Sequence, residues 1–114
     1  MGRNPISSGS GGNITMNNGF NVKRPTLTAN EVYTMELNEP CYSALVKNFT
    51  DGVLYVFNGN NKNSFDENKA IKINAKMGQN VFINLIVSSS EESFNKLFFK
   101  SVAGGEIEVQ LIGF

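Results

Sequence analysis

The chain has 114 residues, no histidine, one cysteine and a formal net charge of zero. This length gives room for one domain, and a single cysteine excludes an intrachain disulfide. Without histidine the commonest general base and metal ligand is missing, so the composition predicts a protein that is not an enzyme and holds no cofactor or metal. No apolar run approaches the roughly 20 residues of a membrane helix, and none near the start resembles a signal peptide.

Residues 1–30 are rich in Gly, Ser and Asn, and they carry three basic residues but no acidic one. Such a segment buries too little apolar surface to become ordered alone, so we predict an extended, flexible N-terminal arm. One interpretation is a tail without a role. The other is a docking arm whose spaced apolar and basic residues contact a neighbour, namely Arg3, Ile14, Met16, Phe20, Lys23 and Arg24. Deletion of residues 2–27 is then expected to leave the rest of the chain folded.

Residues 31–114 contain short apolar runs in which apolar and polar residues alternate, separated by Gly- and Asn-rich breaks. A period of two predicts strands with one buried face. The predicted strands are Val32–Leu37, Tyr42–Phe49, Val53–Phe57, Ala70–Ala75, Val81–Val87, Lys96–Val102 and Glu106–Ile112. About seven short strands at such spacing are typical of a β-sandwich. We therefore predict an all-β fold, a single small antiparallel β-sandwich of the jelly-roll or immunoglobulin-like kind, over residues 31–114.

The breaks between these strands carry turn signals. Asp51-Gly52 predicts a hairpin between the second and third strands, and Ala103-Gly104-Gly105 predicts a tight turn before the last one. Residues 58–68 form a polar loop that we expect to project into solvent. The body as a whole has seven Lys against ten Asp and Glu. This acidic balance argues against a nucleic-acid partner, because phosphate contacts need a basic face.

Several strands carry more apolar residues than one core needs. The surplus residues are Tyr55, Phe57, Phe82, Ile86 and Phe98. One interpretation is that the arm or a loop of the same chain covers them. The other is a subunit interface in a homo-oligomer. Both interpretations predict contact, and they differ in which chain provides the second surface.

Motifs that would indicate chemistry are weak. Asn13-Ile14-Thr15 and Asn48-Phe49-Thr50 match the N-glycosylation sequon, but no secretory signal accompanies them. The loop at residues 58–68 has oxygen ligands, yet it lacks the spacing of a calcium-binding EF-hand.

Three stretches resemble small accessory virion proteins of tailed bacteriophages, namely Leu45–Val56, Ala70–Gly78 and Leu97–Val109. Proteins of this group are compact β-sandwiches found as capsid decoration proteins, head fibres or tail attachments. The resemblance implies a structural protein of the virion, above all a capsid decoration or cement protein that binds the major capsid protein or another virion protein. It carries over no site residues.

Two alternatives to capsid decoration remain open. One is a tail or neck adaptor. The other is a binding module for host-surface glycans, in which exposed aromatic rings would act as stacking platforms, although the chain has no Trp. The candidate platforms are Tyr42, Tyr55, Phe57 and Phe65.

Overall fold

The computed structural model describes residues 21–37, 41–83 and 96–113. These residues form nine β-strands and two 3-10 helices, η1 (Lys62–Ser64) and η2 (Glu67–Lys69), and neither helix is long enough to cross a membrane. The strands are β1 (Val22–Lys23), β2 (Thr26–Leu27), β3 (Tyr33–Glu36), β4 (Ser43–Asn48), β5 (Leu54–Gly59), β6 (Ile71–Ile73), β7 (Gly78–Phe82), β8 (Lys96–Ser101) and β9 (Gly105–Ile112). Each strand predicted from the sequence has a counterpart, and β1 and β2 are additional.

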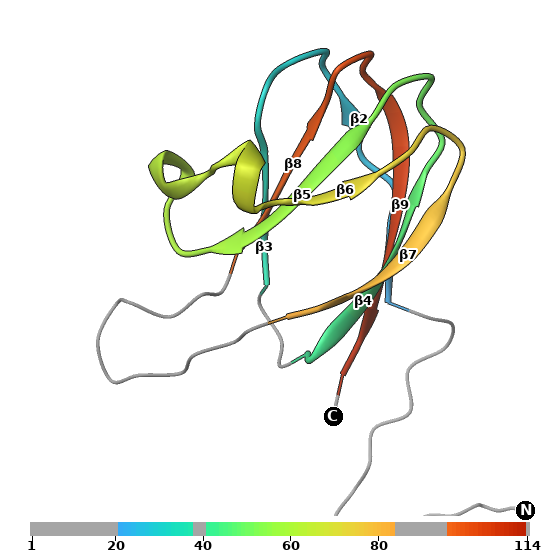
Figure 1. Ribbon diagram of the computed structural model, residues 1–114. Helices are drawn as coiled ribbons and strands as arrows, with labels where there is room; N and C mark the ends of the chain where they lie inside the picture. Colours follow the sequence, from blue (N-terminus) through green and yellow to red (C-terminus); the bar gives the residue numbers. More distant parts are fainter. Residues whose placement is uncertain (1–20, 38–40, 84–95, 114) are drawn as a thin grey trace, which may run out of the picture.

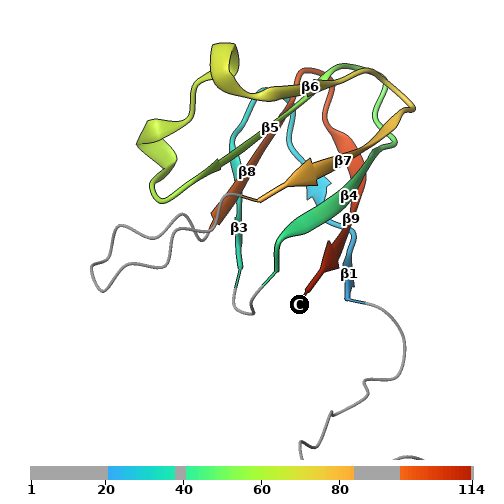
Figure 2. The ribbon, with the colours of Figure 1, turned by 60° about the horizontal axis from the view of Figure 1, so that its bottom comes forward.

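The strands form two antiparallel sheets that pack face to face (Figures 1 and 2). The first sheet has the order β1-β9-β4-β7, with β2 also pairing with β9, and the second has the order β3-β8-β5-β6. The core lies between the sheets and is apolar. Its fully buried side chains include Ala44, Val46, Leu54, Leu97, Phe99, Ile107 and Val109. The predicted all-β antiparallel sandwich is confirmed.

The pairing of the strands is that of a jelly roll. β1 and β2 both pair with β9, so together they act as one first strand. Counting inward from there, β3 pairs with β8, β4 with β7, and β5 with β6. This nested pairing arises when one long hairpin rolls up into two sheets, which is the jelly-roll arrangement. Of the two sandwich types that the sequence left open, the strand order therefore selects the jelly roll.

The folded part of the chain begins before Glu31, where the sequence placed the end of the arm. β1 and β2 lie on β9, and Leu27 is buried in the core. Each of these strands has only two residues, and Arg24 and Pro25 interrupt any alternation between them. The Pro25 carbonyl accepts a hydrogen bond from the Ile107 N–H at 3.1 Å, but proline has no N–H to donate in return, so one bond of the ladder is missing between β1 and β2. Residues 1–20 of the predicted arm lie outside the described residues.

The two turn signals bend the chain without making hairpins. Residues 49–53 lead from β4 in the first sheet to β5 in the second, and residues 102–104 lead from β8 back to β9. The predicted hairpin at Asp51-Gly52 is therefore wrong, whereas the tight turn predicted at Ala103-Gly104-Gly105 is present and joins strands of different sheets. Among the described strands, β5 and β6 are the consecutive pair that does lie side by side, and their link contains η1 and η2.

Candidate interaction surfaces

Among the described residues, exposed side chains and a buried polar cluster are more evident than a group of reactive side chains. The described residues contain no group of three or more His, Cys, Asp or Glu side chains that could hold a metal ion. The thiol of Cys41 is buried, and this burial raises its pKa, which disfavours the reactive thiolate. The candidate functional regions are therefore the polar cluster at one end of the sandwich and the outer faces of the two sheets.

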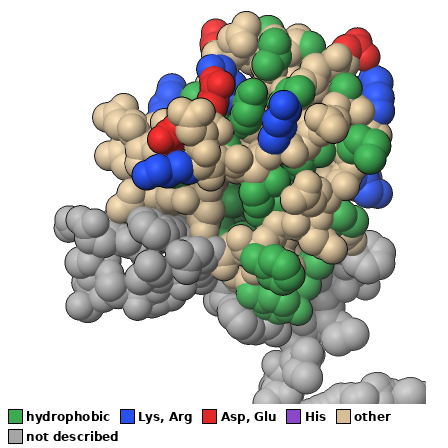
Figure 3. Space-filling model, viewed as in Figure 1, with side chains coloured by type: hydrophobic (Ala, Val, Ile, Leu, Met, Phe, Trp, Pro, Cys, Tyr) green, Lys and Arg blue, Asp and Glu red, His purple; other side chains and the backbone are tan. Residues whose placement is uncertain are grey.

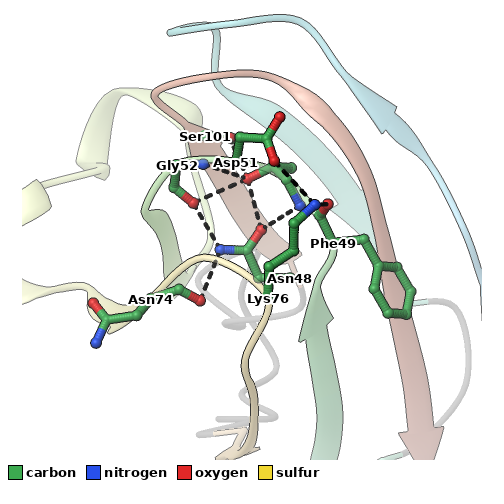
Figure 4. Close-up of polar contacts among 8 residues, drawn as sticks. Asn48, Phe49, Asp51, Gly52, Asn74, Lys76 and Ser101 are labelled. Carbon is green, nitrogen blue, oxygen red and sulfur yellow. Dashed lines mark hydrogen bonds and ion pairs between the residues drawn. The ribbon is translucent and has the colours of Figure 1, made fainter.

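A buried amide holds together the corners at one end of the sandwich (Figure 4). Asn48 is fully buried, and its Nδ2 donates to the carbonyls of Gly52, Ile73 and Asn74 at 2.9, 3.1 and 3.1 Å. Its Oδ1 accepts from the backbone N–H and the hydroxyl of Thr50 at 3.0 and 2.7 Å. One side chain thus links the β4–β5 corner to the β6–β7 corner.

Ser101 extends this cluster to two further corners. Its hydroxyl donates to the Thr50 Oγ1 at 3.1 Å and accepts from the Gly104 N–H at 3.0 Å, while its carbonyl accepts from the Asn30 N–H at 2.8 Å. Gly104 has φ +75°, and a Cβ there would lie 2.8 Å from the Ala29 nitrogen, so this corner requires glycine.

The role of the cluster is structural. The Asn48 amide is buried and fully hydrogen-bonded, so the sequon at Asn48-Phe49-Thr50 is closed to glycosylation in the folded state. Lys76 covers this region from outside through an ion pair with Asp51 at 3.0 Å and a hydrogen bond to the Phe49 carbonyl at 2.7 Å (Figure 4). The sequence did not single out this cluster, because its members come from four separate stretches of the chain.

The outer face of the second sheet is covered by its own chain. Phe98 points away from the core, since its neighbours Leu97 and Phe99 point into it, yet its exposed fraction is 0%. Its ring centroid lies 6.3 Å from that of Phe57, which in turn lies 5.7 Å from that of Phe65 in an edge-on arrangement. The prediction that Phe98 belongs to a subunit interface is therefore wrong, because a loop of the same chain takes that place.

This covering loop follows β5 and is fixed at several points. Asn61 and Asp66 cap η1 and η2 by accepting the N–H groups of Asn63 and Asn68 at 2.8 and 2.9 Å. At its start Gly59 permits close packing, since a Cβ there would lie 3.0 Å from the Phe57 ring and 3.0 Å from the Ser64 hydroxyl. The loop was expected to project into solvent, but its Phe65 returns to the sheet.

Tyr55 lies on the same outer face and is half-buried. Its cross-strand neighbours are Lys72 on β6 and Lys100 on β8. Lys100 forms an ion pair with Glu67 of η2, which holds the loop against the sheet. Tyr55 and Phe57 therefore offer only part of their rings to a partner.

On the outer face of the first sheet, three charged side chains from neighbouring segments form a row across the strands. The Nε of Arg24 donates to the Glu108 Oε1 at 2.9 Å, and the Lys47 Nζ lies 3.5 Å from the Glu108 Oε2. The hydrogen bond from Arg24 is the main cause that lowers the pKa of Glu108. Arg24 thus already binds its own chain, and Lys23 is exposed. Docking through Lys23 and Arg24 stays a prediction, and the other predicted docking residues, Arg3, Ile14, Met16 and Phe20, lie outside the described residues.

Phe82 is the most exposed large apolar residue that the structure describes. Val81 points into the core, so Phe82 points outward from β7, with an exposed fraction of 79%. In the sheet register it lies beside Ser43, which lies beside Ile112. Hydrophobic side chains also gather at this end of the molecule over the ends of β4 and β7 (Figure 3). Phe82 is therefore available to a partner, whereas Ile86 lies outside the described residues.

Comparisons of the chain with protein families, with curated proteins and with solved structures found no match. Its function is therefore inferred from its own residues and geometry.

Proposed function

We propose that this chain is a structural component of a tailed-bacteriophage particle and, more narrowly, a capsid decoration protein. Its N-terminal residues dock on the major capsid protein or on another virion protein, and its sandwich contacts further copies of the chain. The jelly-roll order supports this proposal, because jelly rolls are frequent among viral capsid domains. The same fold also occurs in lectin domains and cupins, so fold alone does not decide.

The observation that carries the proposal is the way the N-terminal part joins the sandwich. β1 pairs with β9, and the Leu111 N–H donates to the Asn21 carbonyl at 2.9 Å. The preceding 20 residues, which contain no acidic side chain, are therefore tied to a fixed point on the sheet. Extended, such a segment reaches about 65 Å, enough to contact a neighbouring subunit. On a repeated lattice, many such tethered contacts act at a high effective concentration.

Deletion of residues 2–19 tests the docking. The deletion must stop there, because removal of residues 2–27 would take β1 and β2 from the sheet and leave β9 paired on one side alone, with β4. We expect the circular dichroism spectrum and the midpoint of thermal unfolding to be unchanged. Co-sedimentation with capsids of the encoding phage should be lost. A truncated protein that binds these capsids at full strength would contradict the proposal.

A matched substitution separates a specific contact from a general effect of charge. Arg3→Ala removes one positive charge from the arm, and Lys62→Ala removes one from an exposed position in η1. We expect the first to weaken capsid binding and the second to leave it unchanged. Negative-stain images of particles that carry labelled protein then distinguish the capsid surface from the tail or neck.

Glycan binding is the second candidate, and the exposure of Tyr42 is the observation that favours it. The Tyr42 side chain has an exposed fraction of 44%, whereas Phe57 and Phe65 pack on each other. Screening on a glycan array tests it. Reproducible binding that Tyr42→Ala or Tyr55→Ala weakens would support glycan recognition in place of decoration.

A further inference from the structure

β7 differs from the other strands at the edges of the two sheets. Sheet edges in natural proteins are protected from pairing with other chains by shortness, charge or proline. β1 and β2 have two residues each. Lys23 belongs to β1, Pro25 lies between the two strands, and β3 ends in Glu36. β6 has three residues centred on Lys72. β7 has five residues, Gly-Gln-Asn-Val-Phe, without charge or proline.

The backbone groups that β7 turns away from its sheet belong to Gly78, Asn80 and Phe82. The Ile83 N–H donates to the Tyr42 carbonyl at 2.8 Å, and the Met77 carbonyl accepts from the Asn48 N–H at 2.8 Å. The direction of the backbone N–H and C=O groups alternates along an antiparallel strand. The backbone groups of the odd-numbered residues of β7 therefore point to β4, and those of the even-numbered residues point away from the sheet. Within the described part of the chain, β4 is the strand that pairs with β7.

We propose that β7 of one copy pairs antiparallel with β7 of a second copy, around a two-fold axis at Asn80. In this register Asn80 exchanges two backbone hydrogen bonds with Asn80 of the second copy, and Gly78 exchanges two with Phe82 of the second copy. Every outward N–H and C=O of β7 then has a partner, and the two first sheets become continuous. The inference builds on the self-association in the proposed function, but it needs no capsid.

The side chains fit this register. Gly78, Asn80 and Phe82 share the outer face of the sheet, so the Phe82 ring of one copy lies over Gly78 of the other. Gly78 leaves room there, and next to it lies the Lys47 stem, whose Cγ is 3.4 Å from where a Cβ on Gly78 would stand. An aromatic ring across from a glycine in a neighbouring strand is a favourable pair. The pairing therefore covers the most exposed apolar side chain that the structure describes.

Charge selects β7 over β6 for such a contact. Residues 77–83 contain no charged side chain, so the two-fold axis places no like charges directly opposite each other. The same operation on β6 would place its central Lys72 opposite Lys72 of the second copy. The partner that fits β7 is thus a second copy of this chain, and an extended peptide of another protein is the competing occupant.

Cysteine cross-linking of the full chain tests the register. In a hydrogen-bonded antiparallel pair the two Cα atoms are about 5.5 Å apart, which suits a disulfide. Asn80→Cys should therefore give a covalent dimer under mild oxidation. The matched control Gln79→Cys should give none, because the Cα atoms of residue 79 in the two copies lie about 8 Å apart, on opposite sides of the axis. Equal cross-linking of both variants, or none with Asn80→Cys, would overturn the register.

Sedimentation equilibrium of the purified full chain tests the association itself. We expect a concentration-dependent dimer, and we expect Phe82→Lys to raise its Kd at least tenfold. Val102→Lys, which changes an exposed residue between β8 and β9, should leave the Kd unchanged. A monomer at all concentrations, larger open-ended assemblies, or an unchanged Kd for Phe82→Lys would each refute the proposal. A monomeric Phe82→Lys variant that still binds capsids would show that docking and edge pairing are separate.

Discussion

Phe98 and Phe82 both point away from the core, one from each sheet, yet Phe98 is fully buried and Phe82 is 79% exposed. The difference follows from topology. β8 lies inside its sheet, and the long link after the neighbouring β5 contacts this face through the ion pair of Glu67 with Lys100 and the packing of Phe65 on Phe57, whereas β7 is an edge strand among those described. In this fold the surplus Phe98 on the central strand β8 is therefore covered by its own chain, and Phe82 on the edge strand β7 remains open to another chain.

Replacement of Phe98 tests the covered side of this comparison most strongly. Phe98→Ala removes a fully buried ring and leaves a cavity beneath the η1–η2 loop, which typically costs about 3–5 kcal/mol. Urea unfolding followed by circular dichroism measures this loss. Val102→Ala, at an exposed position after the same strand, should change the free energy of unfolding by less than about 0.5 kcal/mol. A loss below about 1 kcal/mol for Phe98→Ala would mean that the loop does not cover this face.

Removal of the cover itself should have a smaller effect. Phe65 is half-buried, so Phe65→Ala should cost about 1–2 kcal/mol and should expose the rings of Phe57 and Phe98. Urea unfolding gives the cost, and increased binding of the dye ANS reports the exposed rings. The control Glu67→Gln breaks the ion pair to Lys100 without removing apolar contact, so it should cost less than about 1 kcal/mol and leave dye binding unchanged.

On the open side, Phe82→Ala should leave the stability of a single copy nearly unchanged. The ring is mostly in water, so the free energy of unfolding at a concentration below the dimer Kd should change by less than about 0.5 kcal/mol. At high protein concentration the wild-type chain should become more stable while the variant does not. Unfolding curves at two concentrations measure both effects. An equal response of both proteins to concentration would remove Phe82 from the association.

Local alternation predicted much of this fold, because burial of one face leaves a period of two in each strand. In the last strand, Ile107 and Val109 were expected to face the core and are buried, and Leu111 packs against it. β1 and β2 could not be predicted in this way. Each is too short to show a period, and each is held in place by β9, about 80 residues further along the chain.

The candidate surfaces were only partly predictable for the same reason. The pattern identified Phe82 and Phe98 as surplus apolar residues, but it could not tell a central strand from an edge strand, since strand order is a property of the whole fold. The turn at Asp51-Gly52 likewise predicted a reversal of the chain but not which strands would pair. Phe98 packs on Phe57, and Phe57 packs on Phe65 of the following loop, whose return to the sheet no local sequence pattern indicated.

The weakest expected effect concerns the charged row on the open outer face of the first sheet. Arg24 and Lys47 lower the pKa of Glu108, so its carboxylate is more stable in the folded than in the unfolded chain. This contribution is present at neutral pH, and it is lost as the pH falls below the ordinary carboxyl pKa of 4.5 towards the lowered value. The wild type should therefore exceed Glu108→Gln in stability by a small amount at pH 7, and the difference should shrink towards pH 3. Urea unfolding across this range, with the exposed Glu106→Gln as control, measures it. A difference that grows on acidification would show that the ion pair of Arg24 with Glu108 does not stabilise the folded chain.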